Sequence, residues 1–487
     1  MRKLARDISW HIFRMLSYSL SGAFVVLLAG AILYLNNRPD LSIWHRANLD
    51  AEFNEHSPVR SFTEYRALEE RLFKQLDTEV YEKIRPADRY PVNRYHRGSL
   101  SDPDRWPVNW NRSFELPLDR PAAGVLLLHG LSDSPYSLRG LGQGFHTAGA
   151  WVIGLRLPGH GTTPAGLTHT SWRDMAMAVR LAVDHLYEKT HGKPVYIVGY
   201  STGATLAVHY SLMTLMDPER VPIQGLVLIA PAIGVSPAAA LAVWQARLGH
   251  LLGLEKLEWN TVLPEYDPYK YSSFAINASD QVYRLTQEVQ SRLKAMDAAT
   301  LQRFPPTLAF QSASDATVAA ADLTDKFLIH LPPGKHEVVI FDINRLNTLQ
   351  YLLAHDPAPR LNALLKTGSL PFTVSILTNH TPDSRRLVIH SKAAGETQME
   401  IKSTQLYWPE NVYAISHVAL PISPRDPLYG NGNTPGASPL QLGNLALRGE
   451  KGVLRLSGTD MLRLRWNPFY NYLESKTLDF MELQNLP

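Results

Sequence analysis

Short, mostly apolar runs alternate with longer segments of helical periodicity along the middle of the chain. Strands that are apolar on both faces are typical of a parallel sheet covered by helices on both sides. Segments 172–189 and 204–216 carry the helical spacing of apolar residues. The predicted strands, after an edge strand at 112–116, are 124–128, 151–155, 195–198, 225–229, 307–311 and 338–341. The sequence therefore predicts an α/β domain with a mostly parallel sheet.

Two insertions interrupt this alternation within the domain, which we expect to span 111–487. Residues 235–304 are helical in pattern and bear aromatic side chains, and they predict a helical cap over the carboxyl edge of the sheet. Residues 345–410 form the second insertion, where two strand-like segments flank a polar turn and predict a hairpin. The aromatic cap residues include Trp244, Trp259 and the run 266–271, and the hairpin consists of 372–377, the turn 378–384 and 386–389.

The N-terminal 37 residues differ from the rest of the chain. Residues 1–14 form a basic leader, and residues 15–37 contain no charged side chain. The uncharged run is long enough to cross a bilayer, which takes about 20 residues. We expect a single transmembrane helix with its N-terminus in the cytoplasm and the folded domain outside it, in the periplasm if the source is bacterial.

A cleaved signal peptide is the alternative for this segment, with Ala29-Gly30-Ala31 as a small-residue cleavage site. An uncleaved anchor is favoured because the apolar run continues beyond these residues. Residues 38–110 are expected to form a stalk leading into the domain. Within it, the capping-box candidate 61–64 predicts the start of a packing helix.

The net charge and the absence of cysteine exclude several classes of function. The formal net charge of +3 is accounted for by the basic leader, so the folded part is close to neutral. A nucleic-acid partner is therefore not expected, since it would need clustered positive charge on the folded part. The chain has no cysteine, which excludes disulfides, thiolate metal sites and a cysteine nucleophile.

The strand at 195–198 leads into Gly199-Tyr200-Ser201-Thr202-Gly203, followed by small apolar residues of a predicted helix. G-x-S-x-G between a strand and a helix is the pattern of a nucleophile elbow. The sharp turn strains the serine backbone, and glycine two residues before and after it removes side chains that would collide. Ser201 is therefore the predicted nucleophile.

A serine hydroxyl is a weak nucleophile unless a base accepts its proton and a carboxylate orients that base. After such an elbow the acid and then the histidine are expected beyond the carboxyl ends of later strands. Asp315, shortly after a predicted strand, is the expected acid, and Asp342 at the end of the next strand is its rival. His417 follows an apolar run and precedes a proline-rich loop, so it is the expected base, with His390 next.

An oxyanion hole needs two backbone N–H groups directed at one oxygen. We expect them from Thr202, at the start of a helix where negative charge is favoured, and from Leu131, in the loop after the first core strand. His129 and His160 stand beside glycines and are expected to fix loops by hydrogen bonding. No H-E-x-x-H, dinucleotide-binding or Walker-type segment occurs, so neither a metal nor a cofactor is predicted.

Several of these segments, in this order, resemble the α/β-hydrolase superfamily, and within it the serine hydrolases of the monoacylglycerol lipase and bacterial carboxylesterase (serine aminopeptidase-like) type. They are 128–139 (oxyanion loop), 157–164 (G-H-G loop), 199–203 (elbow) and 314–318 (acid turn). The resemblance covers about 115–345 and resumes at 416–418. It implies the α/β-hydrolase fold and ester hydrolysis through an acyl-enzyme without a cofactor. The residues that it assigns are Ser201 as nucleophile, Asp315 as acid, His417 as base, and Leu131 and Thr202 as oxyanion donors.

The sequence thus predicts a membrane-anchored serine hydrolase that cleaves carboxylic esters, with monoacylglycerol-like or lysophospholipid substrates. One alternative is an amide or peptide hydrolase of the aminopeptidase kind, which needs an acidic pocket for the substrate amine. Its candidate charges are Glu255, Glu258, Glu265 and Asp267 in the cap. The other alternative is a non-catalytic, membrane-tethered interaction protein that retains the fold.

Overall fold

A single large sheet organises the part of the chain that the computed structural model describes, which is residues 2–234, 254–434, 439–445 and 457–483. Its strands are β1 (Phe114–Leu116), β2 (Ala123–Leu128), β3 (Ala150–Leu155), β4 (Val195–Tyr200), β5 (Gly225–Ile229), β8 (Thr307–Ser312), β9 (His336–Phe341), β10 (Thr373–Asn379), β11 (Arg386–Lys392) and β12 (Glu400–Tyr407). In these residues the sheet has ten strands, in the order β1-β3-β2-β4-β5-β8-β9-β10-β11-β12. Neighbours from β3 to β10 run parallel, whereas β1, β11 and β12 are antiparallel. The mostly parallel sheet predicted from the sequence is confirmed.

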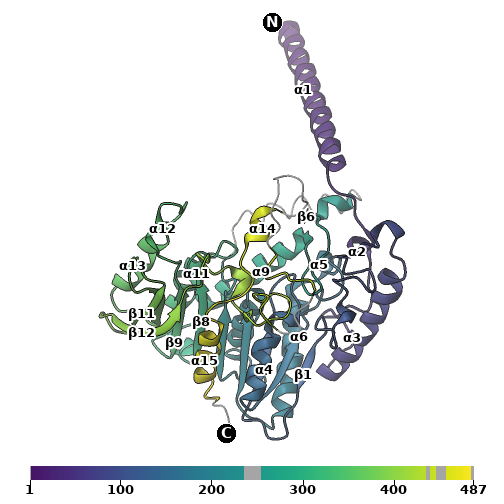
Figure 1. Cartoon of the computed structure of the whole chain (residues 1–487). Coiled ribbons are helices and arrows are strands. Elements are labelled where there is room, and N and C mark those ends of the chain that lie inside the picture. The colour runs from purple at the N-terminus through teal and green to yellow at the C-terminus, as the bar shows by residue number, and fades with distance from the viewer. Residues whose placement is uncertain (1, 235–253, 435–438, 446–456, 484–487) are drawn as a thin grey trace.

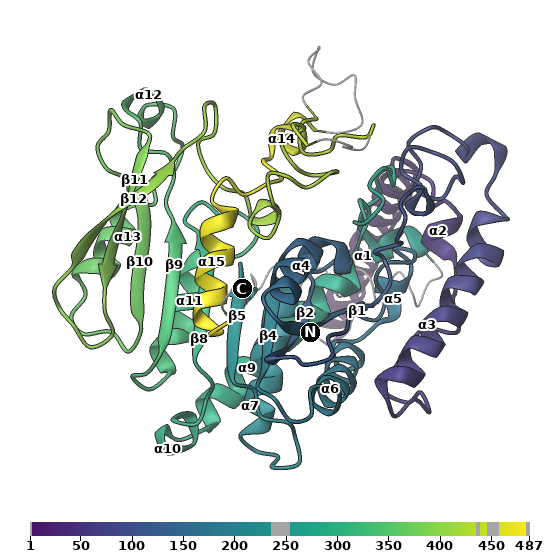
Figure 2. The ribbon, with the colours of Figure 1, turned by 60° about the horizontal axis from the view of Figure 1, so that its bottom comes forward.

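Helices cover both faces of this sheet (Figures 1 and 2). The principal covering helices are α4 (Arg139–Thr147), α6 (Trp172–Lys189), α7 (Thr202–Thr214), α9 (Ile276–Ala295) and α15 (Tyr470–Phe480). Alternate residues of β2 enter two different cores: Leu126 and Leu128 pack with α6, α7 and α9, and Val125 and Leu127 pack with α4 and α15. All four side chains are buried, which is why this strand is apolar without alternation.

The remaining α-helices of the described residues lie mostly in the insertions and the N-terminal segment. They are α2 (Ile43–Arg46), α3 (Phe62–Leu76), α5 (Gly166–His169), α10 (Ala298–Leu301), α11 (Ala320–Lys326), α12 (Asn347–Gln350), α13 (Ala358–Lys366) and α14 (Gly458–Leu462). A separate pair of short strands, β6 (Trp259–Thr261) and β7 (Phe274–Ala275), is antiparallel.

The insertion at 235–304 is a cap only in part, which corrects the expectation from the sequence. Its last helix, α9, buries Leu285, Val289 and Leu293 in the same core as α7. These positions recur every four residues, so they form one apolar stripe that covers the sheet face and not its edge. The described cap is therefore the segment 254–275, and Trp244 lies outside the described residues. Trp259 is buried, with its ring centroid 4.9 Å from that of His45.

The insertion at 345–410 extends the main sheet. Its predicted hairpin is present as β10 and β11, which pair antiparallel, and β10 also pairs in parallel with β9. Figure 2 shows these strands continuing the sheet on the side opposite α3. The last strand, β12, is exposed along most of its length. Because neither of its faces is covered, it carries no apolar pattern that would have predicted it.

The N-terminal helix α1 (Arg2–Asn36) stands away from the body of the protein (Figure 1). No helix formed by the described residues is both long enough and apolar enough to cross a membrane. Residues 38–110 do not form a free stalk, because α3, capped by Ser61 as expected, buries Phe62, Tyr65 and Leu68 in the main core. This segment is part of the packed domain.

Arg156, just after β3, ties the N-terminal segment to the sheet. Its side chain is 1% exposed and donates two hydrogen bonds to Glu52, at 3.1 and 3.0 Å. The buried carboxylate of Glu69 lies 3.7 Å from it. Burial raises the pKa of Glu69, and the charge of Arg156 opposes that rise. One guanidinium thus compensates two carboxylates at this junction.

We expect Arg156→Ala to lower the free energy of unfolding by about 3–5 kcal/mol, because it leaves two carboxylates without their counter-charge in a buried site. Urea denaturation followed by circular dichroism measures this change. The matched control is Arg46→Ala, which breaks a half-exposed pair with Glu255 and should change stability little. Equal effects of the two variants would contradict this role of Arg156.

Candidate active site

Ser201 occupies a strained turn between β4 and α7. Its φ is 54° and its ψ is −116°, a region that residues other than glycine rarely adopt. A Cβ atom at Gly199 would lie 2.5 Å from backbone atoms of Ala204. A Cβ atom at Gly203 would overlap the carbonyl oxygen of Leu128 at the end of β2. Glycine at both positions is therefore a steric requirement of this turn, as the spacing predicts.

Asp315 and His417 lie together although 102 residues separate them along the chain: His417 Nδ1 is 2.7 Å from Asp315 Oδ2. The same oxygen accepts a hydrogen bond from Gln311 Nε2 at 2.9 Å. The other oxygen accepts the N–H groups of Thr317 and Val318, at 2.8 and 3.1 Å. Burial by itself would raise the pKa of Asp315, but these hydrogen bonds and the charge of His417 hold it below the ordinary value of 3.8.

Asp342, the alternative acid, is bound by other side chains, and His390, the alternative base, lies far from the elbow. The carboxylate of Asp342 accepts hydrogen bonds from Arg345 at 2.7 and 2.8 Å and from the hydroxyl of Thr378. Its partner is thus a guanidinium and not a histidine. His390 lies on β11, and β5, β8, β9 and β10 separate that strand from the elbow strand β4. Neither residue joins Ser201, Asp315 or His417.

The elbow and the acid–histidine pair meet at Tyr200. The ring of Tyr200, next to Ser201, has its centroid 5.2 Å from that of the His417 ring. Among the residues that the structure describes, Ser201 Oγ and His417 Nε2 have no hydrogen-bond partner. Catalytic hydrogen bonds are often long in an empty site and tighten when the substrate binds. The arrangement brings the nucleophile candidate and the base candidate to one place with their reactive atoms unengaged.

The loop after β2 lies directly against the elbow. A Cβ atom at Gly130 would be 2.9 Å from the Tyr200 ring and 3.2 Å from Ser201 Cβ. The N–H groups of Leu131 and Thr202 donate no hydrogen bond to any residue in the described ranges. Two unpaired donors flanking one serine are what an oxyanion hole requires.

His129 and His160 hold loops, as predicted. Leu157 N–H donates to His129 Nε2 at 3.0 Å, so His129 Nδ1 carries the proton and donates to the carbonyl of Gly130 at 2.8 Å. His160 Nδ1 lies 2.9 Å from the carbonyl of Pro158. Burial lowers the pKa of His129 well below 6.5 and that of His160 to about 4. Both rings are therefore neutral at pH 7 and hold their loops in place by hydrogen bonds.

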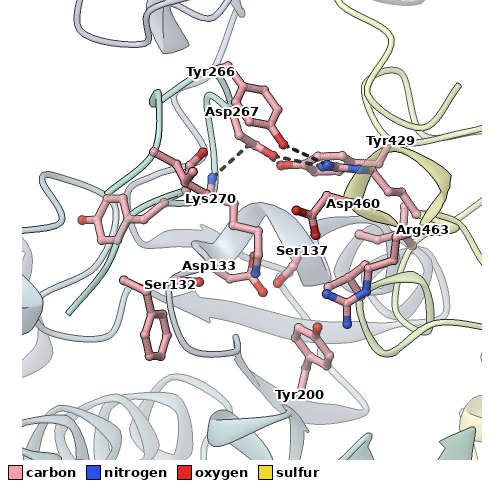
Figure 3. A pocket seen from close by; sticks show the side chains of 17 residues that line it. Ser132, Asp133, Ser137, Tyr200, Tyr266, Asp267, Lys270, Tyr429, Asp460 and Arg463 are labelled. Atoms are coloured by element: carbon pink, nitrogen blue, oxygen red, sulfur yellow. Dashed lines mark hydrogen bonds and ion pairs between the residues drawn. The ribbon is translucent and has the colours of Figure 1, made fainter. Parts of the chain in front are cut away.

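A cavity of about 270 Å³ opens beside the elbow, between the oxyanion loop, the cap and the segment after His417 (Figure 3). Its lining includes aromatic and aliphatic side chains together with both acids and bases. The lining residues are Ser132, Asp133, Ser137, Tyr200, Leu263, Tyr266, Asp267, Lys270, Tyr271, Ser272, Phe274, Val418, Ile422, Tyr429, Asp460, Arg463 and Arg465. No group of three histidine, aspartate or glutamate side chains in the described ranges is arranged to hold a metal ion.

Of the four acidic cap residues considered for binding an amine, only Asp267 lines this cavity. Glu265 is fully buried and accepts the N–H groups of Ser272 and Ser273, so it shapes the cap. Asp267 Oδ1 accepts a hydrogen bond of 2.5 Å from the hydroxyl of Tyr429. The position of Asp267 in the sequence did not separate it from the other three.

Asp426 was not singled out from the sequence, yet it joins the oxyanion loop to the segment that carries His417. It accepts hydrogen bonds from the Tyr136 hydroxyl at 2.9 Å and from Arg139 at 2.8 Å. It also accepts the N–H groups of Leu428 and Tyr429. The sequence shows Asp426 only as a carboxylate in the proline-rich loop after the predicted base. Because aspartate is common in such turns, its position did not indicate this role.

Known proteins are similar to the part of the chain that contains the elbow and the acid turn. A family model described as "Serine aminopeptidase, S33" matches residues 119–343. A thermostable monoacylglycerol lipase of Bacillus sp. (strain H-257) is 26% identical over 222 residues, which is 45% of this chain and 76% of the relative. Phospholipase YtpA of Bacillus subtilis (strain 168) is 29% identical over 119 residues, covering 24% of this chain and 43% of the relative.

A solved structure of a soluble variant of monoglyceride lipase from Saccharomyces cerevisiae is also similar. It shares 16% identity with a TM-score of 0.37, over 47% of this chain and 81% of the other. The family match and the curated relatives together support a serine ester hydrolase with the α/β-hydrolase fold.

We expect Gly203→Ala to destabilise the elbow by about 1–3 kcal/mol or more, because the added methyl overlaps the backbone of β2. Reaction with a fluorophosphonate should fall with it, since the serine turn shifts. Thermal unfolding and the labelling rate measure the two effects. Ala204→Gly is the matched control: it costs about 1 kcal/mol of helix stability and should keep its labelling. Normal labelling of Gly203→Ala would contradict the steric argument.

Proposed function

We propose that this chain, an α/β-hydrolase of the monoacylglycerol lipase and esterase type over residues 119–343, hydrolyses carboxylic esters of lipids with Ser201, Asp315 and His417 as its triad. The observation that carries the proposal is the 2.7 Å contact between His417 Nδ1 and Asp315 Oδ2 beside the elbow serine. A carboxylate bound to Nδ1 fixes the ring so that Nε2 is the nitrogen free to accept a proton.

The reaction then proceeds in two halves. His417 Nε2 accepts the proton of Ser201 as Oγ attacks the ester carbonyl carbon. The oxygen of the tetrahedral intermediate accepts hydrogen bonds from the N–H groups of Leu131 and Thr202. His417 gives its proton to the leaving alcohol, and an acyl-enzyme remains on Ser201. Water, deprotonated by His417, attacks the acyl carbonyl and releases the carboxylic acid.

Asp315 serves both halves without taking up a proton. Its carboxylate accepts four hydrogen bonds among the described residues, and these favour the charged form. An ionised partner at Nδ1 stabilises the imidazolium that forms when Ser201 loses its proton. The lowered pKa of Asp315 supports this role at every pH at which the histidine can act as a base.

Amide hydrolysis is the second candidate. The description of the matching family model as a serine aminopeptidase favours it, and so does the carboxylate of Asp267 in the cavity. Against it, Arg465 lies 3.5 Å from Asp267 and compensates its charge. Turnover of an aminoacyl amide and of an acyl ester by the same preparation separates the two, and we expect the ester to be preferred.

Membrane anchoring through the N-terminal helix is a proposal from the sequence. Its structural support is that α1 extends away from the domain (Figure 1) and that large apolar side chains on it are exposed. They include Phe13, Leu16, Leu20, Val25, Val26 and Leu33, each at least 55% exposed. Apolar side chains in such number on a lone helix need a cover, and a bilayer supplies one next to lipid substrates.

We expect Ser201→Ala and His417→Ala to lower kcat by about 10⁴-fold or more, and Asp315→Asn by about 10⁴-fold, because the three act as a unit. A panel of acyl esters of increasing chain length measures the rates, and a fluorophosphonate reports the serine. His390→Ala, a histidine on β11, should retain full activity. Labelling of Ser201→Ala at the wild-type rate would refute the assignment.

Removal of residues 1–37 should transfer the protein from the membrane fraction to the soluble fraction of expressing cells. Because the domain keeps its core, kcat/KM for a short-chain, water-soluble ester should stay unchanged. Fractionation and an ester assay on both forms test this. Recovery of the full chain in the soluble fraction would contradict the anchor while leaving the triad untouched.

A further inference from the structure

The cavity beside the elbow combines apolar surface with many hydroxyl-bearing and charged side chains. Only four of its lining residues are apolar, namely Leu263, Phe274, Val418 and Ile422. The others bear hydroxyl, carboxylate, ammonium or guanidinium groups, and a volume of about 270 Å³ suits a compact group. Charged and hydroxyl groups placed in such a space can fix the orientation of the polar alcohol half of the ester.

Two of the three bases that line this cavity have an acidic partner. Lys270 Nζ lies 2.9 Å from Asp133 Oδ1, and Arg465 Nη1 lies 3.5 Å from Asp267 Oδ2. Figure 3 shows Asp133 and Lys270 together at the floor of the cavity. Because each base is paired with an acid, these two pairs present little net charge to a ligand.

Arg463 is different. Its Nη2 donates a hydrogen bond of 2.8 Å to Thr317 Oγ1, a neutral partner. No carboxylate lies within 4.0 Å of its guanidinium in the ranges that the structure describes, and its other N–H groups have no partner there. Thr317 also donates its N–H to Asp315, so this guanidinium is held beside the acid turn of the proposed triad.

Arg463 also lies close to the nucleophile. In Figure 3 its guanidinium is directed toward the ring of Tyr200, the residue before Ser201. Burial raises the pKa of the Tyr200 hydroxyl, and the positive charge of Arg463 counteracts that rise, which places the two groups within electrostatic reach. An anchored guanidinium without an acidic partner at the mouth of a polar cavity is suited to an anionic ligand.

We propose that Arg463 binds an anionic oxygen group, a phosphate or a carboxylate, on the alcohol half of the ester, so that the preferred substrates are phosphate-bearing lysolipids and not neutral monoacylglycerols. The inference rests on the proposed ester hydrolysis. The guanidinium offers a planar pair of donors that matches two oxygens of such a group.

The test compares three substrates with one acyl chain: a monoacylglycerol, its phosphate-bearing lysophosphatidylglycerol analogue, and the monoacylglycerol with a succinate half-ester on a free hydroxyl. We expect the wild-type chain to prefer the two anionic esters. Arg463→Gln should lower kcat/KM for them by about 10- to 100-fold and leave the neutral ester within about twofold. Arg463→Lys should restore part of the preference, since it keeps the charge but not the planar donors.

Arg89→Gln is the matched control, because it removes the same charge from an exposed position and should change no substrate. A fluorophosphonate labelling rate equal to that of the wild type verifies that Arg463→Gln keeps its active site. A loss confined to the phosphate ester, or one shared by the succinate ester, supports the proposal and identifies which anion is bound. An unchanged ratio between anionic and neutral esters overturns it. If the wild type cleaves none of the three, it is the proposed ester hydrolysis that fails.

Discussion

The close approach of the elbow backbone to the end of β2 is the constraint on which the site depends. Gly203 fits against the carbonyl of Leu128 with no room for a side chain, and Ser201 is held at a φ of 54° between β4 and α7. The same contact sets the loop after β2 against the serine. A single steric condition thereby brings together the nucleophile candidate and the two candidate oxyanion donors, Leu131 and Thr202.

The candidate base, His417, is held differently, through polar contacts between distant segments. His417 is held by its hydrogen bond to Asp315. Four hydrogen bonds in turn leave the Asp315 carboxylate little freedom to move. The segment after His417 is held by Asp426, which binds Tyr136 in the oxyanion loop, and by Tyr429, which binds Asp267 in the cap. Oxyanion loop, histidine segment and cap therefore form one hydrogen-bonded unit, and the polar cavity lies within it.

Local sequence patterns were sufficient to predict the parallel strands of the sheet and the elbow turn. The run 195–198 predicts β4 because it is apolar on both faces, and the glycines around Ser201 predict the turn because their reason is steric and local. The cap was less predictable, since α9 has the same helical periodicity whether it covers an edge or a face. The exposed strand β12 carries no apolar pattern. Arg463 donates to Thr317 across 146 residues of chain, a contact that spacing alone does not encode.

The central claim is that Ser201 Oγ is the attacking nucleophile, that His417 accepts its proton, and that the N–H groups of Leu131 and Thr202 bind the oxygen that becomes negative. The most direct measurement is a crystal structure of the full chain after reaction with a phosphonate ester. The account predicts a covalent bond from Ser201 Oγ to phosphorus, the phosphonyl oxygen about 3 Å from the N–H groups of Leu131 and Thr202, and His417 Nε2 about 3 Å from an oxygen of the adduct. An adduct on another residue, or a His417 ring turned away from it while still bound to Asp315, would contradict the account.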